Sequence, residues 1–133
     1  MKSLKYSLGL FFFFYLSILN AQFSEISGQK TIGNEKHNFA YSVVSLSDGG
    51  YIVLGDTETD TNSMDYLISR VSADNETLWQ YTYGGSGSDR PSKILKQNED
   101  SFLIIGSTNS TDGDVSFNNG GYDFWILDIN IKG

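Results

Sequence analysis

Short runs of apolar and β-branched residues alternate along the chain with clusters of Gly, Asp, Asn and Ser. This pattern predicts short β-strands joined by tight turns, and no segment after residue 21 has the length, periodicity and caps of a helix. We therefore expect an all-β protein made of antiparallel strands. The predicted strands span residues 29–32, 41–46, 51–56 and 66–71 in a first unit, and 78–83, 92–96, 102–107 and 124–131 in a second.

The two units are copies of one pattern. A shift of 51 residues carries the segment 51–55 onto 102–106, and after a seven-residue insertion a shift of 58 residues carries 65–68 onto 123–126. A period of about 50 residues is typical of arrays in which one supersecondary unit recurs, and it suits a propeller blade. The shifts match Val43 with Ile94, Tyr51 with Phe102, Ile52 with Leu103, Val53 with Ile104, Leu54 with Ile105, Tyr66 with Phe124, Ile68 with Ile126 and Val71 with Ile129.

We expect two tandem four-stranded propeller-like blades, with repeat one at about 29–79 and an incomplete repeat two at about 80–133. Gly55 and Gly106 recur in both copies and indicate places where the backbone turns or is closely approached. Asp65 and Asp123 also recur, just before an apolar strand. Their recurrence favours a structural role, in which the carboxylate accepts turn or strand amides, over a catalytic one.

The first residues of the chain predict export. Lys2 and Lys5 precede an apolar run at 8–19, and Asn20-Ala21 offers a cleavage site before Gln22. We expect residues 1–21 to be a signal peptide, because the apolar run is shorter than the roughly 20 residues of a spanning helix. An uncleaved signal anchor is the alternative. The predicted location is secreted or cell-surface, with no membrane span after cleavage.

Composition excludes several classes of protein. The chain has no cysteine, so it carries no disulfide framework, thiolate metal site or catalytic thiol. With 16 acidic and 9 basic residues its net charge is -7, which argues against a nucleic-acid partner. A single histidine, His37, leaves no set of ligands for zinc.

Four segments carry a resemblance to a known family. Segments 48–55, 79–89, 110–115 and 121–126 (DGGYIVLG, WQYTYGGSGSD, STDGDV and GYDFWI) resemble the repeats of secreted bacterial β-propeller-type proteins. The resemblance covers residues 27–133. It implies long exported chains with several such repeats, which often end in a sorting domain for type IX secretion. It specifies function hardly at all, although some members are labelled endoglucanase-like.

The chain departs from that pattern because it holds about two repeats and no sorting domain. A propeller closes with about 4 to 8 blades, and two blades alone leave apolar faces and strand edges in water. We therefore expect a fragment of a larger β-propeller, or closure through further repeats or self-association. In one form of closure, residues 29–32 would pair with residues 124–131 of the same chain or a neighbour.

Acidic and amide side chains on the inserted loop suggest a calcium site. Asp112, Asp114 and Asn118 offer hard oxygen ligands of the kind that calcium prefers, and Asn119 lies beside them. The alternative is a set of solvated turns, since the segment after Asp114 has no acid to complete an EF-hand pattern. Calcium is the only cofactor that the sequence indicates. A second acidic cluster comprises Asp56, Glu58 and Asp60.

Trp79, Tyr122 and Trp125 are the candidate binding surface. Exposed aromatic side chains stack on sugar rings and anchor interfaces, whereas aromatics at alternating strand positions fill the core, and both interpretations stay open.

We expect a non-catalytic, exported β-propeller-like module that binds or scaffolds a glycan or a cell-surface protein, with no catalytic residues. The rival is a polysaccharide-degrading enzyme built on a pair of acids. Asp114 and Asp128, which have no acidic counterpart in the other repeat, are its candidates.

Overall fold

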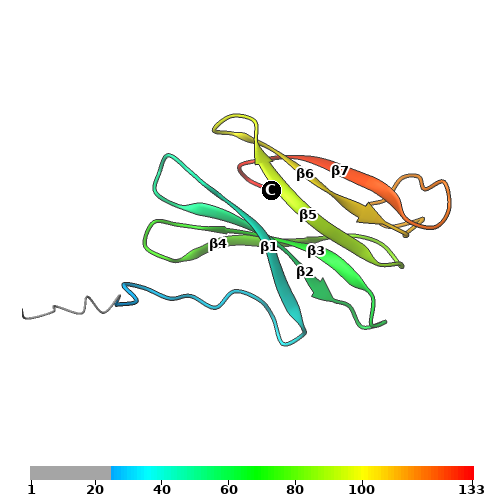
Figure 1. Cartoon of the computed structure of the whole chain (residues 1–133), viewed down its shortest axis with the longest axis horizontal. Helices are drawn as coiled ribbons and strands as arrows, with labels where there is room; N and C mark the ends of the chain where they lie inside the picture. The colour runs from blue at the N-terminus through cyan, green and yellow to red at the C-terminus, as the bar shows by residue number, and fades with distance from the viewer. Residues whose placement is uncertain (1–24) are drawn as a thin grey trace, which may run out of the picture.

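The computed structural model describes residues 25–133. The predicted signal peptide, residues 1–21, lies outside the described residues. The described chain forms two antiparallel β-sheets without a helix, which confirms the all-β prediction. Sheet one has the order β1 (Asn38–Ser45), β2 (Tyr51–Glu58), β3 (Met64–Val71) and β4 (Thr77–Tyr83). Sheet two has the order β5 (Asp89–Lys96), β6 (Ser101–Thr108) and β7 (Asp123–Asn130), as Figure 1 shows.

The structure corrects the prediction at residues 29–32, which form no strand; residues 29–31 are exposed and Ile32 is half-buried. Ile32 is the one strongly apolar side chain of that segment, so a strand there would have no apolar face to bury. The predicted pairing of this segment with β7 within the chain is also wrong, because the segment forms no strand and β7 is the last strand of sheet two.

The strand predicted at 78–83 exists but belongs to the first unit. Its residues form β4, which pairs with β3 at the outer edge of sheet one, so that Ile68 lies opposite Tyr81. Sheet one therefore has the expected four strands. Sheet two has three in the described part of the chain, not the predicted four.

An identical irregularity marks the first strand of each sheet. The pairing register shifts between Ala40 and Ser42 in β1, and again between Pro91 and Lys93 in β5, which lie 51 residues further on. Such a bulge bends the strand and increases its local twist. A glycine faces each bulge, since Ala40 lies opposite Gly55.

Gly106 shows why those positions need glycine. It lies opposite Pro91, and a β-carbon at Gly106 would lie 2.7 Å from the Pro91 Cα and overlap the Arg90 carbonyl and the Tyr66 hydroxyl. A β-carbon at Gly55 would overlap the Phe39 carbonyl in the same way. The close approach predicted from the recurring glycines is therefore found, although both glycines lie within strands.

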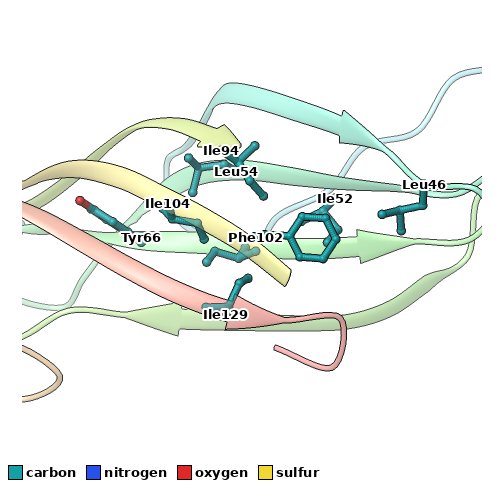
Figure 2. Packing of buried hydrophobic residues seen from close by; sticks show 9 residues of the cluster. Leu46, Ile52, Leu54, Tyr66, Ile94, Phe102, Ile104 and Ile129 are labelled. Atoms are coloured by element: carbon teal, nitrogen blue, oxygen red, sulfur yellow. The ribbon is translucent and has the colours of Figure 1, made fainter. Parts of the chain in front are cut away.

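One apolar core lies between the two sheets. Side chains of a strand alternate between its two faces, so Ile52 and Leu54 of β2 share a face with Ile68 of β3, which lies opposite Leu54. Sheet two packs its own apolar face on theirs, and β5 contacts β1, β2 and β3. The core cluster, shown in Figure 2, comprises Leu46, Ile52, Leu54, Tyr66, Ile68, Ile94, Phe102, Ile104 and Ile129.

Full burial of one such side chain stabilises a fold by roughly 1.5–3 kcal/mol. The core is therefore what holds sheet two against sheet one. Residues 25–133 include no helix of the length and apolarity needed to span a membrane.

Candidate functional site at the connecting loops

Two loops meet at one end of the sheets. Residues 84–88 run from β4 of sheet one to β5 of sheet two, and residues 109–122 connect β6 to β7. The second loop contains the seven-residue insertion that distinguishes repeat two from repeat one. We call the two segments together the connecting loops.

Every backbone amide of residues 84–88 donates to a side-chain oxygen. Such bonds fix a loop that has no regular structure of its own. The acceptors are Asp114 Oδ2 for Gly84 at 3.0 Å, Asp89 Oδ2 for Gly85 at 2.9 Å, Asp112 Oδ1 for Ser86 at 2.6 Å, Ser110 Oγ for Gly87 at 2.9 Å, and Asn109 Oδ1 for Ser88 at 2.5 Å.

This network accounts for the glycines of the first loop. A β-carbon at Gly85 would lie 2.6 Å from Asp112 Oδ1 and 2.8 Å from the Ser110 Cβ. A β-carbon at Gly87 would lie 2.8 Å from the Ser110 nitrogen. The glycines therefore let the first loop lie directly against the second, and its amides are occupied by protein acceptors.

The predicted calcium ligands divide between two parts of the second loop. Asp112 and Asp114 both face the first loop and accept its amides, whereas the Asn118 amide group donates to the Thr108 carbonyl at 3.1 Å. Asn118 Oδ1 accepts the Gly120 amide at 2.6 Å. Among residues 25–133, no three His, Cys, Asp or Glu side chains are arranged to hold a metal ion. Calcium binding stays a prediction.

The three acids of the second acidic cluster each contact a different side chain of the protein. Asp56 accepts the Tyr41 hydroxyl at 2.9 Å, and Asp60 pairs with Lys36 at 2.5 Å. The Glu58 carboxylate lies 3.9 Å from His37, whose side chain is exposed.

A pair of carboxylates from different sheets lies beneath the connecting loops. A β-carbon added to Gly84 would lie 2.5 Å from Asp65 Oδ1 and 2.6 Å from Asp89 Oδ2. The two carboxylate oxygens are therefore at most about 5.1 Å apart. Asp89 is fully buried, and its Oδ2 also accepts the Ser110 hydroxyl at 2.8 Å.

The sequence did not single out Asp89. Asp65, the other member of the pair, was noted because it recurs in the second repeat as Asp123. Asp65 Oδ1 and Asp89 Oδ1 are both buried without a hydrogen-bond partner in the described part of the chain. Burial raises the pKa of the Asp65 carboxyl to about 6, and repulsion by Asp89 and Asp114 adds to the effect. Asp65 therefore holds a proton at a pH where an exposed aspartate has lost it.

We expect Asp65→Asn to be more stable than the parent protein at neutral pH. An unfolded aspartate titrates near pH 3.9, whereas folded Asp65 titrates near 6, so the folded state binds the extra proton between these values. The stability of the parent protein therefore falls as pH rises through this window, and that of the variant does not. Urea unfolding at about pH 4 and about pH 7 measures the difference, which should vanish at the lower pH.

Asp48→Asn is the matched control with the opposite sign. The Asp48 carboxylate accepts the Gly50 amide at 2.9 Å and pairs with Arg70 at 2.8 Å, and both contacts lower its pKa. This variant should be less stable than the parent protein at neutral pH, and the deficit should disappear in acid. Equal pH profiles for the parent protein and Asp65→Asn would contradict the assignment.

Neither acid pair is arranged for glycoside hydrolysis. Asp89 is fully buried, so a sugar cannot reach the Asp65–Asp89 pair without a rearrangement. Asp114 lies in the connecting loops, whereas Asp128 lies opposite Leu103 and accepts the Ser101 hydroxyl at 3.3 Å. At the usual rise per residue Asp128 is roughly 16 Å along β7 from the loop end of that strand, so the two acids do not flank one cleft.

Two of the three candidate aromatic residues pack inward. The Trp79 indole donates to the Ile131 carbonyl at 3.0 Å, and the ring packs against the core. Trp125 is tilted on Tyr66 across the sheets, with ring centroids 4.7 Å apart. Tyr122 is 53% exposed at the end of the inserted loop.

Two exposed aromatic residues lie near Tyr122 in the chain, and sequence reasoning missed one of them, Phe117. Phe117 in the inserted loop is 74% exposed, and Phe124 at the start of β7 is 91% exposed. Phe117 could have been found from its place in the inserted loop. Residues of repeat two that have no counterpart in repeat one do not serve the structural role that the two repeats share.

No protein-family model matches the chain, and no curated protein is significantly similar to it.

Proposed function

We propose that the chain is a non-catalytic module of an exported β-propeller-type repeat protein, and that it binds an extracellular glycan through the inserted loop. The observation that carries this proposal is that the loop is fixed by hydrogen bonds on one side and presents exposed aromatic side chains elsewhere. A binding surface gains affinity when its loop is ordered before the ligand arrives, because less conformational entropy is lost.

The fixed part of the loop is residues 109–114. These residues accept four of the five amides of the facing segment, and the Asp114 amide donates back to the Gly84 carbonyl at 2.9 Å. The Asn119 amide donates to Asp123 Oδ2 at 2.5 Å, which fixes the far end of the loop on β7. Phe117 lies between these two anchors.

The exposed aromatic residues are the proposed contact surface. Phe117 and Tyr122 are 74% and 53% exposed. An aromatic ring offers a large, rigid, apolar face, and the Tyr122 hydroxyl adds a polar group, which together suit the apolar faces and hydroxyl groups of a sugar. Similar surfaces also suit proteins, so a cell-surface protein is the second class of partner.

The proposal that the sheets are propeller blades is supported by their common construction. Strands β1, β2 and β3 have counterparts in β5, β6 and β7 in the same order, and the bulge recurs after 51 residues. Export is supported by the predicted signal peptide.

A glycan array followed by a reducing-sugar assay tests the function. We expect binding without turnover, and an approximately tenfold weaker affinity for Phe117→Ala and for Tyr122→Ala, which corresponds to about 1.4 kcal/mol for each lost aromatic contact. Phe39→Ala is the matched control, because Phe39 is 57% exposed on β1 and outside the loop.

Turnover that Asp114→Ala abolishes would instead support the polysaccharide-degrading enzyme. Retention of full affinity by both loop variants would contradict the proposed surface.

A further inference from the structure

The two repeats expose equivalent residues to different degrees. Tyr66 and Ile68 of sheet one are fully buried against sheet two. Their counterparts in sheet two, Phe124 and Ile126, are 91% and 56% exposed. The same positions therefore form a buried interface in sheet one and a bare apolar surface in sheet two.

Phe124 and Ile126 belong to one continuous face. Ile126 of β7 lies directly opposite Ile105 of β6, and Phe124 and Leu103 share that face by strand alternation. We call these four residues the free face of sheet two. Their counterparts Ile52, Leu54, Tyr66 and Ile68 are the residues with which sheet one contacts sheet two.

The opposite half of the interface is also duplicated. Sheet two contacts sheet one through Ile94, Phe102 and Ile104, which are buried. Their counterparts Val43, Tyr51 and Val53 lie on the outer face of sheet one, where Val43 is 60% exposed and lies opposite Val53. We call these three residues the free face of sheet one.

We propose that the free face of sheet two docks on the free face of sheet one in a second copy of this chain. The partner is a second copy because this chain itself presents the matching half, built from the positions that already pack between its own sheets. Burial of exposed apolar surface supplies the free energy of association. Each copy uses two different faces, so the interface is head-to-tail and leads either to a closed ring or to an open chain.

The free face of sheet one has a border that the partner must accommodate. Residues Lys30, Thr31 and Ile32 line a cavity of about 400 Å³ together with Tyr51 and Val53. Residues 30–32 form no strand, so they do not extend sheet one. Tyr51 and Val53 are half-buried, whereas Val43 is mostly exposed and does not line this cavity.

Two charge substitutions and their mixture test the docking. Ile126→Asp blocks the free face of sheet two, and Val43→Asp blocks that of sheet one. Both side chains are mostly exposed, so the monomer fold should persist, which circular dichroism checks. By sedimentation velocity we expect self-association of the parent protein and a monomer for each variant. An equimolar mixture of the variants should form a heterodimer, because each supplies the face that the other lacks.

Phe117→Asp is the control, since Phe117 is exposed but lies on neither face; it should associate like the parent protein. A monomeric parent protein at every concentration would overturn the proposal. Self-association of Val43→Asp at the parent level would overturn it as well, because it would show that two sheet-two faces pair with each other. Glycan binding does not require this interface, so failure here leaves the proposed function standing.

Discussion

Phe102→Ala should lower the free energy of unfolding by about 3–5 kcal/mol. Phe102 is fully buried in the core between the sheets, on the face that sheet two presents to sheet one. Removing its ring takes away the transfer free energy of the buried atoms and leaves a cavity that the strands cannot fill by collapse. A domain of this size is stable by roughly 5–15 kcal/mol, so the loss is a large part of the total.

Urea unfolding followed by circular dichroism measures this loss, with Phe117→Ala as the control. Phe117 is 74% exposed, so its truncation should change the free energy of unfolding by less than about 0.5 kcal/mol. If Phe102→Ala were as mild as the control, Phe102 could not lie in a shared core.

Gly106→Ala should destabilise the protein by about 3 kcal/mol, near the upper end of what overpacking costs. The added methyl group would overlap the carbonyl of Arg90 and the hydroxyl of Tyr66, and it would lie 2.7 Å from the Pro91 Cα. Two of these three neighbours are backbone atoms of the bulged strand β5, so they cannot turn away as a surface side chain does. Relief requires separation of β5 from β6 or of sheet one from sheet two.

Gly28→Ala is the matched control for that substitution. A β-carbon at Gly28 would meet only the Asn75 amide group, at 3.8 Å, which is an ordinary contact. Thermal unfolding of both variants compares them directly. A Gly106→Ala protein as stable as Gly28→Ala would show that the bulge does not press on β6.

Local pattern was sufficient to predict most of the strands. Apolar alternation located β2 and β6 within two residues, because a strand with one buried face must place apolar side chains at every second position. The same reasoning fails at residues 29–32, which form no strand because the segment has only one strongly apolar side chain to bury. Tight turns between the strands were also expected, and one lies at Asp48-Gly49-Gly50, where Gly49 has a φ of 83°.

The phase of the repeat could not be predicted. A sequence that repeats every 51 residues looks the same wherever a unit is taken to begin, so residues 78–83 could open the second unit or close the first. Hydrogen bonding between β3 and β4 decides the matter, and pairing partners are not encoded locally.

The buried carboxylate pair lay beyond sequence reasoning for a similar reason. Asp65 is the second residue of β3 in sheet one, and Asp89 is the first residue of β5 in sheet two, so their meeting depends on how one sheet packs on the other. Trp79 and Trp125 illustrate the same limit, because alternation places each on a face but does not say whether that face is covered.

The packing of the two sheets on one core is tested most directly by nuclear Overhauser contacts between the Tyr66 and Trp125 rings. These residues come from different sheets, and their ring centroids lie 4.7 Å apart. We predict strong cross-peaks between the two rings at neutral pH. Cross-peaks confined to residues of the same sheet would contradict the shared core.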